Sequence, residues 1–171
     1  MQNEPKILRR LPVHPSNKVD VSAYVLRVNG LVGQTLELTP SDFEGLPQRD
    51  VTADFTCEAG WTVPAVKWWG VALESVLALA GAHPEAKWVQ ASAGEFTVPI
   101  PLQDARRALL ATRLGEGALP SEHGGPVRLI VPGGDCWTSI KWLDHLELRT
   151  EPGPNTGKAM ALGRLRCKSP K

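Results

Sequence analysis

The shortness of its regular segments is what most constrains the fold of this chain. Alternating apolar and polar residues predict a half-buried strand over 51–56, and the composition favours further strands over 24–29, 88–91, 96–100, 127–131 and 142–150. Helices are predicted over 39–44, 70–80 and 102–112, with Gly45 and Gly81 as stop signals for the first two. Since strands and helices do not alternate as regular βαβ units, the pattern favours an α+β fold over a doubly wound sheet.

The length of 171 residues suits one domain. We assign it to residues 1–150, with an extended Pro-rich arm over 1–20 and a peripheral tail over 151–171. The 6 tryptophans all lie in the central ninety residues, and most of them are expected to be large core anchors.

Charge and cysteine usage narrow the class of partner and the compartment. A net charge of +1 gives no reason to expect nucleic acid or a membrane surface as partner, and no apolar run approaches the ~20 residues that span a bilayer. The pair Arg9–Arg10 is not followed by an apolar stretch, so the sequence does not predict an export signal here. Three widely spaced cysteines argue against a disulfide framework, and we predict a cytoplasmic protein.

Three polar features could carry chemistry. Cys57 ends the strand over 51–56 just before a Gly-containing turn, His123 is followed by two glycines and a proline, and a Gly-rich loop leads from Pro132 to Lys141. Each also has an ordinary explanation: an inert buried cysteine, a tight turn with a capping histidine, and a loop without P-loop spacing. No single feature therefore decides the function.

Together and in this order, these features resemble the oxidoreductase molybdopterin-binding domain of the sulfite oxidase family, including its bacterial methionine-sulfoxide-reductase relatives. The matching stretches are FTCEAGW at 55–61, WWGVAL at 68–73, LPSEHGGPVRLIVP at 119–132 and WTSIKW at 137–142. The segment VNGLV at 28–32 also fits, so the resemblance spans roughly residues 12–150. It implies a sulfite-oxidase-type fold and a molybdenum–molybdopterin cofactor.

The resemblance also implies a set of site residues. Cys57 takes the position of the thiolate that binds molybdenum, and it is the predicted catalytic residue; a soft sulfur donor suits a redox-active metal. The residues implied to bind the pterin and its phosphate, through hydroxyl, imidazole, guanidinium, backbone amide and ammonium groups, are Ser92, His123, Arg128, Ser139, Ile140 and Lys141.

Two positions depart from the family pattern. Cys136 stands where the family usually has a glycine, and Thr138 stands where it commonly has a lysine. A weaker phosphate contact, or one supplied by Arg106 or Arg107, would follow, although a basic helix end is more often simply solvated. Cys136 could also be a redox-active thiol, with a packed loop side chain as the plainer interpretation.

Three functions stay open at this point. The first is a molybdenum-dependent oxidoreductase that moves an oxygen atom to or from a sulfite- or sulfoxide-class substrate and exchanges electrons with a separate partner. The second is a non-catalytic pterin- or anion-binding module of the same fold. The third is a cysteine enzyme with Cys57 as nucleophile and His123 or His145 as base, which leaves Arg128 and Lys141 unexplained. The first accounts for most of the motifs.

Overall fold

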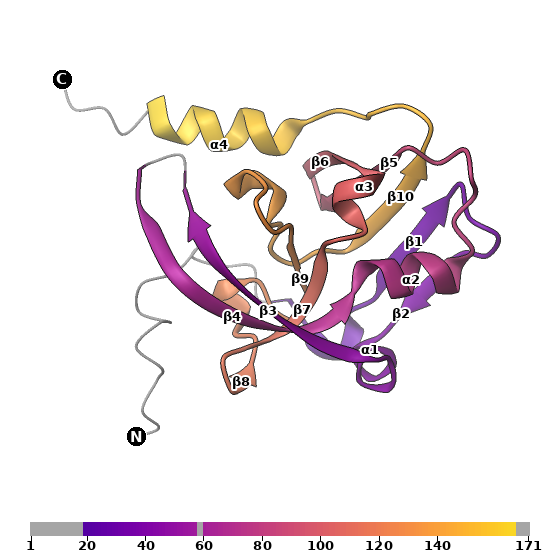
Figure 1. Cartoon of the computed structure of the whole chain (residues 1–171), viewed down its shortest axis with the longest axis horizontal. Helices are drawn as coiled ribbons and strands as arrows, with labels where there is room; N and C mark the ends of the chain where they lie inside the picture. Colours follow the sequence, from indigo (N-terminus) through magenta and orange to yellow (C-terminus); the bar gives the residue numbers. More distant parts are fainter. Residues whose placement is uncertain (1–18, 58–59, 167–171) are drawn as a thin grey trace.

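The computed structural model describes residues 19–57 and 60–166, which form two β-sheets with helices around them (Figure 1). The first sheet has the strand order β2-β1-β10-β5-β6, in which β1 and β10 run parallel and the other neighbours are antiparallel. Its strands are β1 (Leu26–Gly30), β2 (Leu36–Leu38), β5 (Trp88–Ala93), β6 (Phe96–Pro101) and β10 (His145–Arg149).

The second sheet is antiparallel and is dominated by a long hairpin that curves beneath the rest of the molecule in Figure 1. The order is β3-β4-β7-β8, and β9 also pairs with β7. Its strands are β3 (Gln48–Thr56), β4 (Thr62–Ala72), β7 (Leu109–Leu114), β8 (Gly117–Ala118) and β9 (Arg128–Ile130).

The helices are short except the last. Thr39 and Asp42 form a capping box at the start of α1, and Gly81 ends α2 in the left-handed conformation with φ 67°. Their bounds are α1 (Pro40–Gly45), α2 (Leu73–Ala80), α3 (Leu102–Ala105) and α4 (Thr156–Arg166), with 3₁₀ turns η1 (Val21–Ala23), η2 (Ser121–His123) and η3 (Cys136–Thr138). The predicted α+β class is confirmed.

Two apolar clusters lie on opposite faces of the second sheet. Leu110 on β7 belongs to the larger cluster, which also contains the buried side chains of the first sheet and α2. Its neighbours Leu109 and Ala111 point to the other face and join a smaller cluster with Trp68. β7 is therefore buried on both faces, and Arg128 on β9 opposes Ala111 on it.

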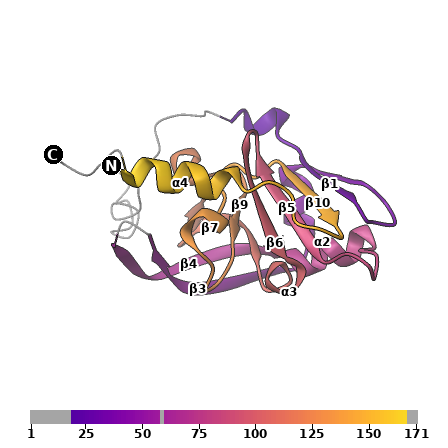
Figure 2. The same ribbon diagram turned by 90° about the horizontal axis from the view of Figure 1, so that it is seen from above.

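The edge of the first sheet is closed by α4, which crosses the side opposite the hairpin (Figures 1 and 2). On the edge strand β6, Thr97 N donates to Thr156 Oγ1 over 2.9 Å. Pro99 and Pro101 carry no N–H, so this edge offers few donors to another strand.

The structure corrects three expectations. Residues 70–72 complete β4, so the helix predicted over 70–80 begins only at Leu73. The helix predicted over 102–112 is wrong beyond its first turn, because α3 ends at Ala105 and β7 begins at Leu109. Tryptophan burial is also lower than expected: Trp68 alone is fully buried, and the other five are partly exposed.

The tail beyond residue 150 contains α4, whose Gly157 packs closely against Phe96 and Val98 of β6. None of the helices formed by residues 19–57 and 60–166 is both long enough and apolar enough to cross a membrane.

Candidate active site

Cys57 lies at the turn of the β3–β4 hairpin. Its N–H donates to the carbonyl of Trp61, and its own carbonyl accepts from Gly60, both over 2.9 Å. From Val51 onward the odd-numbered residues of β3 are half-buried and the even-numbered ones are exposed, and Cys57 continues this alternation. The free thiol therefore lies on the face that carries Phe55, whose ring stacks on Trp61 at a centroid distance of 5.9 Å.

Arg128 is buried between aromatic rings on that same face. Its guanidinium carbon lies 4.9 Å from the ring centre of Phe55 and 5.1 Å from that of Trp68. Nη1 donates to the His123 carbonyl over 2.9 Å, whereas Nε has no hydrogen-bond partner in the described part of the chain. Burial lowers the pKa of Arg128 to about 10, so the side chain still carries its charge at neutral pH.

Lys141 supplies a second cation beside Arg128. Its Nζ donates to the Glu122 carbonyl over 2.8 Å and lies 5.7 Å from the centre of the Trp142 ring. Burial first and the charge of Arg128 second lower the pKa of Lys141 to about 8, against a smaller opposing effect of Glu122. A buried guanidinium whose charge lowers the pKa of a neighbouring ammonium makes a site suited to an anion.

The two glycines after His123 let other backbone segments of the protein pack closely against them. A Cβ atom on Gly124 would lie 2.9 Å from Lys141 Cα, and Gly124 has φ +106°. A Cβ atom on Gly125 would lie 2.1 Å from the Leu119 carbonyl oxygen. The glycines thus bring the segment from Ser121 to Gly124 against Lys141.

The other predicted cofactor residues lie on adjoining elements. His123 is buried in η2, and Ser139 is half-buried at the end of η3. Ile140 is buried in the main core and its carbonyl accepts from Leu129 N, so its contribution to a ligand would come from the backbone amide. Ser92 on β5 accepts at its carbonyl from Asp144 N, three residues beyond Lys141. Their roles as ligand-binding residues stay predictions.

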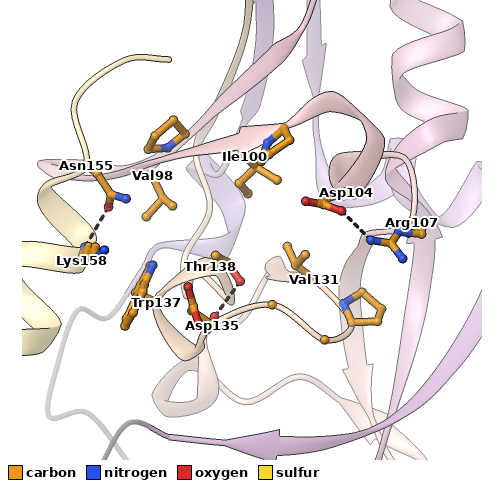
Figure 3. A pocket seen from close by; sticks show the side chains of 15 residues that line it. Val98, Ile100, Asp104, Arg107, Val131, Asp135, Trp137, Thr138, Asn155 and Lys158 are labelled. Carbon is orange, nitrogen blue, oxygen red and sulfur yellow. Dashed lines mark hydrogen bonds and ion pairs between the residues drawn. The ribbon is translucent and has the colours of Figure 1, made fainter. Parts of the chain in front are cut away.

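The two alternative arginines do not join this group. Arg106 is exposed, and Arg107 pairs with Asp104 over 2.5 Å. Figure 3 shows that Arg107 instead borders a pocket of about 260 Å³ between β6, the loop over 131–138 and the start of α4. Thr138 also lines this pocket, and its hydroxyl donates to the Asp135 carbonyl.

This pocket is distinct from the predicted site. Its lining combines the apolar side chains of Val98 and Ile100 with polar side chains, and Lys158 at one end lies over the Trp137 ring (Figure 3). None of the predicted site residues lines it, so we place the candidate chemistry around Cys57, Arg128 and Lys141.

One proposed base has another partner. The Nε2 atom of His145 lies 2.9 Å from Asn29 Oδ1, which joins β10 to β1 in the first sheet. That contact gives His145 a structural role, and it weakens the hypothesis of a cysteine nucleophile served by this histidine.

The residues around Arg128 and Lys141 fit the phosphate-bearing cofactor that the sequence implies. An isolated buried charge is costly, and a guanidinium with an unsatisfied Nε retains donor capacity for an incoming oxygen anion. The Cys57 thiol provides the soft donor that a thiolate-binding metal prefers. Within residues 19–57 and 60–166, no group of three or more His, Cys, Asp and Glu side chains is arranged to hold a metal ion.

The two cations and the Cys57 thiol suit an anionic ligand that contains a metal, and comparison with known proteins identifies the family. Residues 12–157 match the oxidoreductase molybdopterin binding domain, and the chain belongs to this family. The predicted family, and the molybdenum–molybdopterin cofactor that it implies, are thereby confirmed.

Individual relatives agree with this assignment. The chain is 33% identical to the Bacillus subtilis protein described as uncharacterized oxidoreductase YuiH, over 79% of this chain and 70% of that protein. It is 29% identical to sulfite oxidase of Gallus gallus over 82% of this chain, but the match covers only 38% of that enzyme. The sulfane dehydrogenase SoxCD of Paracoccus pantotrophus is similar in structure, with a TM-score of 0.73 and 28% identity over 80% of this chain and 40% of that one.

The aromatic residues of the site were not assigned a role from the sequence. Phe55, Trp68 and Trp142 lay inside the matching motifs, yet their contacts with Arg128 and Lys141 depend on three separate strands and loops meeting. Two of them had a local signal, because Phe55 lies two residues before Cys57 and Trp142 directly follows Lys141, whereas Trp68 has no predicted site residue near it in the sequence.

Proposed function

We propose that this protein is a molybdenum–pterin oxidoreductase that transfers an oxygen atom to or from a sulfur-type substrate of the sulfite or sulfoxide class. The observation that carries the proposal is the pair formed by the buried Arg128 and the half-buried Lys141, with the Arg128 guanidinium against the ring of Phe55, two residues before Cys57. Sulfur chemistry is supported by the names of two relatives, sulfite oxidase and sulfane dehydrogenase.

In this proposal Cys57 is the protein's ligand to molybdenum, and Arg128 and Lys141 bind the phosphate of the pterin. Ser92, His123 and the stretch from Ser139 to Lys141 supply further donors. When bound, the cofactor provides the metal centre at which oxygen transfer and electron exchange take place.

The chain's own contribution is orientation and electrostatics. Arg128 is held by two rings and one carbonyl, which fixes the direction of its remaining N–H donors. Because the guanidinium is buried and the Lys141 ammonium is partly desolvated, an arriving phosphate displaces less water from them than from exposed side chains, and each hydrogen bond it gains is charge-assisted.

We further propose that the protein acts in the cytoplasm and passes electrons to a separate redox partner. The sparse, widely spaced cysteines support that location. The electron partner and the small-molecule oxygen donor or acceptor are inferred from the reaction class.

The decisive experiment is molybdenum content by plasma mass spectrometry on protein produced in a host that makes the cofactor. Wild type should carry near-stoichiometric molybdenum, Cys57→Ser should lose it, and the matched control Cys136→Ser should retain it. A wild type without molybdenum, despite a loaded control enzyme, would refute the cofactor assignment.

Turnover separates the enzyme from the binding module. Loaded protein should oxidise sulfite with ferricyanide or reduce a sulfoxide with reduced viologen. Full molybdenum loading with neither activity would favour a non-catalytic module.

A further inference from the structure

Four successive backbone carbonyl groups, those of residues 121 to 124, line one side of the candidate site; we call them the carbonyl run. Each of them accepts a hydrogen bond, and the donors are three side chains and one backbone amide. The four bonds are Trp142 Nε1 to Ser121 O (2.7 Å), Lys141 Nζ to Glu122 O (2.8 Å), Arg128 Nη1 to His123 O (2.9 Å) and Trp142 N to Gly124 O (3.0 Å). Trp142 therefore donates to the first and the last of the four carbonyl groups, and Lys141 and Arg128 donate to the two between them.

The backbone of Trp142 is strained. It has φ 55°, and among the described residues other than glycine only Ala65 shares a positive value. A bulky residue in the left-handed region is energetically unfavourable and persists only where surrounding contacts enforce it. Two hydrogen bonds enforce this conformation: the backbone N–H of Trp142 donates to the Gly124 carbonyl, and the indole N–H donates to the Ser121 carbonyl.

The strained backbone bears directly on Lys141, the preceding residue. Lys141 Cα lies where a side chain on Gly124 would otherwise sit, so the two segments are in direct contact. With the backbone fixed on both sides, the Lys141 side chain spans from there to the Glu122 carbonyl while its Nζ remains 5.7 Å from the indole centre.

We propose that Trp142 is a positioning residue whose indole N–H and left-handed backbone hold the Lys141 ammonium beside Arg128, spaced for a phosphate monoester before the ligand arrives. Trp142 acts on the ligand only indirectly, through Lys141 and the carbonyl run. This inference rests on the proposed function for the identity of the anion, but the positioning itself is a property of the protein alone.

The test uses the full-length protein without cofactor and the variant Trp142→Phe, which keeps an aromatic ring but removes the N–H donor. The matched control is Trp69→Phe, because Trp69 also lies under a lysine, with Lys67 Nζ 4.8 Å from its ring centre. The Lys141 side-chain nitrogen is observed by NMR in ¹⁵N-lysine protein and assigned with Lys141→Met.

Two readouts are compared. In wild type we expect Lys141 to titrate near 8 and to respond to inorganic phosphate. In Trp142→Phe its pKa should move toward the ordinary 10.5, and the phosphate concentration for half-saturation should rise at least tenfold. Trp69→Phe should leave both values unchanged. A folded Trp142→Phe protein with wild-type values for both would overturn the positioning role.

If Trp142→Phe does not fold, hydrogen exchange of the Trp142 indole N–H in wild type decides the matter. Strong protection supports the anchored indole, and exchange as fast as in an unstructured peptide refutes it. The two proposals can also fail separately. A Lys141 that responds to Trp142→Phe in a protein that never takes up molybdenum would refute only the cofactor function. Full molybdenum loading with an unresponsive Lys141 would refute only the positioning role.

Discussion

Replacing Lys141 with methionine should stabilise the cofactor-free protein at pH 7 while abolishing its affinity for a phosphate group. The pKa of Lys141 is lowered by burial and by Arg128 from 10.5 to about 8, so the folded state binds this proton more weakly than the unfolded state. Between these two values the unfolded chain holds the extra proton, and the free energy of unfolding of wild type therefore rises with pH. Below pH 8 the full cost of the desolvated ammonium is present.

The size of the effect follows from the two pKa values. Their difference, 10.5 against about 8, sets an upper bound of about 3 kcal/mol. Lys141 is only partly buried, and solvent screening reduces this bound to about 1–2 kcal/mol. The substitution also removes the hydrogen bond from Lys141 Nζ to the Glu122 carbonyl, which offsets about 1 kcal/mol of the gain in unfolding free energy at every pH. The change of this stability difference with pH is therefore a clearer test than its absolute value at pH 7.

Urea unfolding at pH 7, 8, 9 and 10, followed by tryptophan fluorescence, measures that dependence. The free energy of Lys141→Met relative to wild type should fall by about 1–2 kcal/mol between pH 7 and pH 10. Other titrating groups contribute equally to both proteins and cancel. The exposed Lys67→Met serves as control, and a Lys141→Met difference as flat as this control would refute the claim that Lys141 is desolvated.

Three further substitutions test the remaining contacts. Arg128→Lys keeps the charge but loses the planar fit between two rings, so we expect a loss of about 2–3 kcal/mol in urea unfolding and loss of molybdenum; wild-type values for both would contradict this. Gly124→Ala should cost about 1–3 kcal/mol because of its φ of +106° and its contact with Lys141, whereas Gly45→Ala, with open space around it, should be within about 1 kcal/mol of wild type. Burial raises the pKa of Tyr24, the chain's single tyrosine, so ultraviolet absorbance should show no tyrosinate at pH 11 until the protein unfolds; a transition near pH 10 in folded protein would contradict its burial.

Local signals predicted the elements whose ends are chemically marked. The capping box at Thr39 and Asp42 begins α1, and Gly81 ends α2 with a positive φ, as the sequence indicated. The strand that leads to Cys57 was also predicted, because one of its faces is exposed and its residues alternate.

The segment over 106–112 shows where sequence reasoning failed. Leu109, Leu110 and Ala111 are fully buried, since β7 has partners on both edges and an apolar cluster on each face. A strand buried on both faces has no alternation, and a short apolar run of this kind reads equally well as a helix. Only the tertiary contacts with β4 and β9 decide between the two.

For the site, motif order anticipated which residues would be brought near one another but not how they are held. Arg128 and Lys141 are 13 positions apart, and the carbonyl run from Ser121 to Gly124 that supports both became visible only in three dimensions. The strain at Trp142 likewise has no sequence signal, because tryptophan is not a residue that ordinarily adopts a positive φ.

Three features of the site act in the same energetic direction, since each lowers the stability of the protein without its ligand. Arg128 is a buried charge whose Nε has no partner among residues 19–57 and 60–166, Lys141 is a partly desolvated ammonium, and Trp142 has a strained backbone. A bound phosphate would satisfy the donors and raise the pKa of Lys141 above its value in the free protein. The pH dependence should therefore change on loading: the rise in unfolding free energy between pH 8 and 10 should disappear or become a fall, because the proton now stabilises the folded complex. Thermal unfolding of loaded and cofactor-free protein across this range measures the change, and parallel curves would show that the anion does not bind at Lys141.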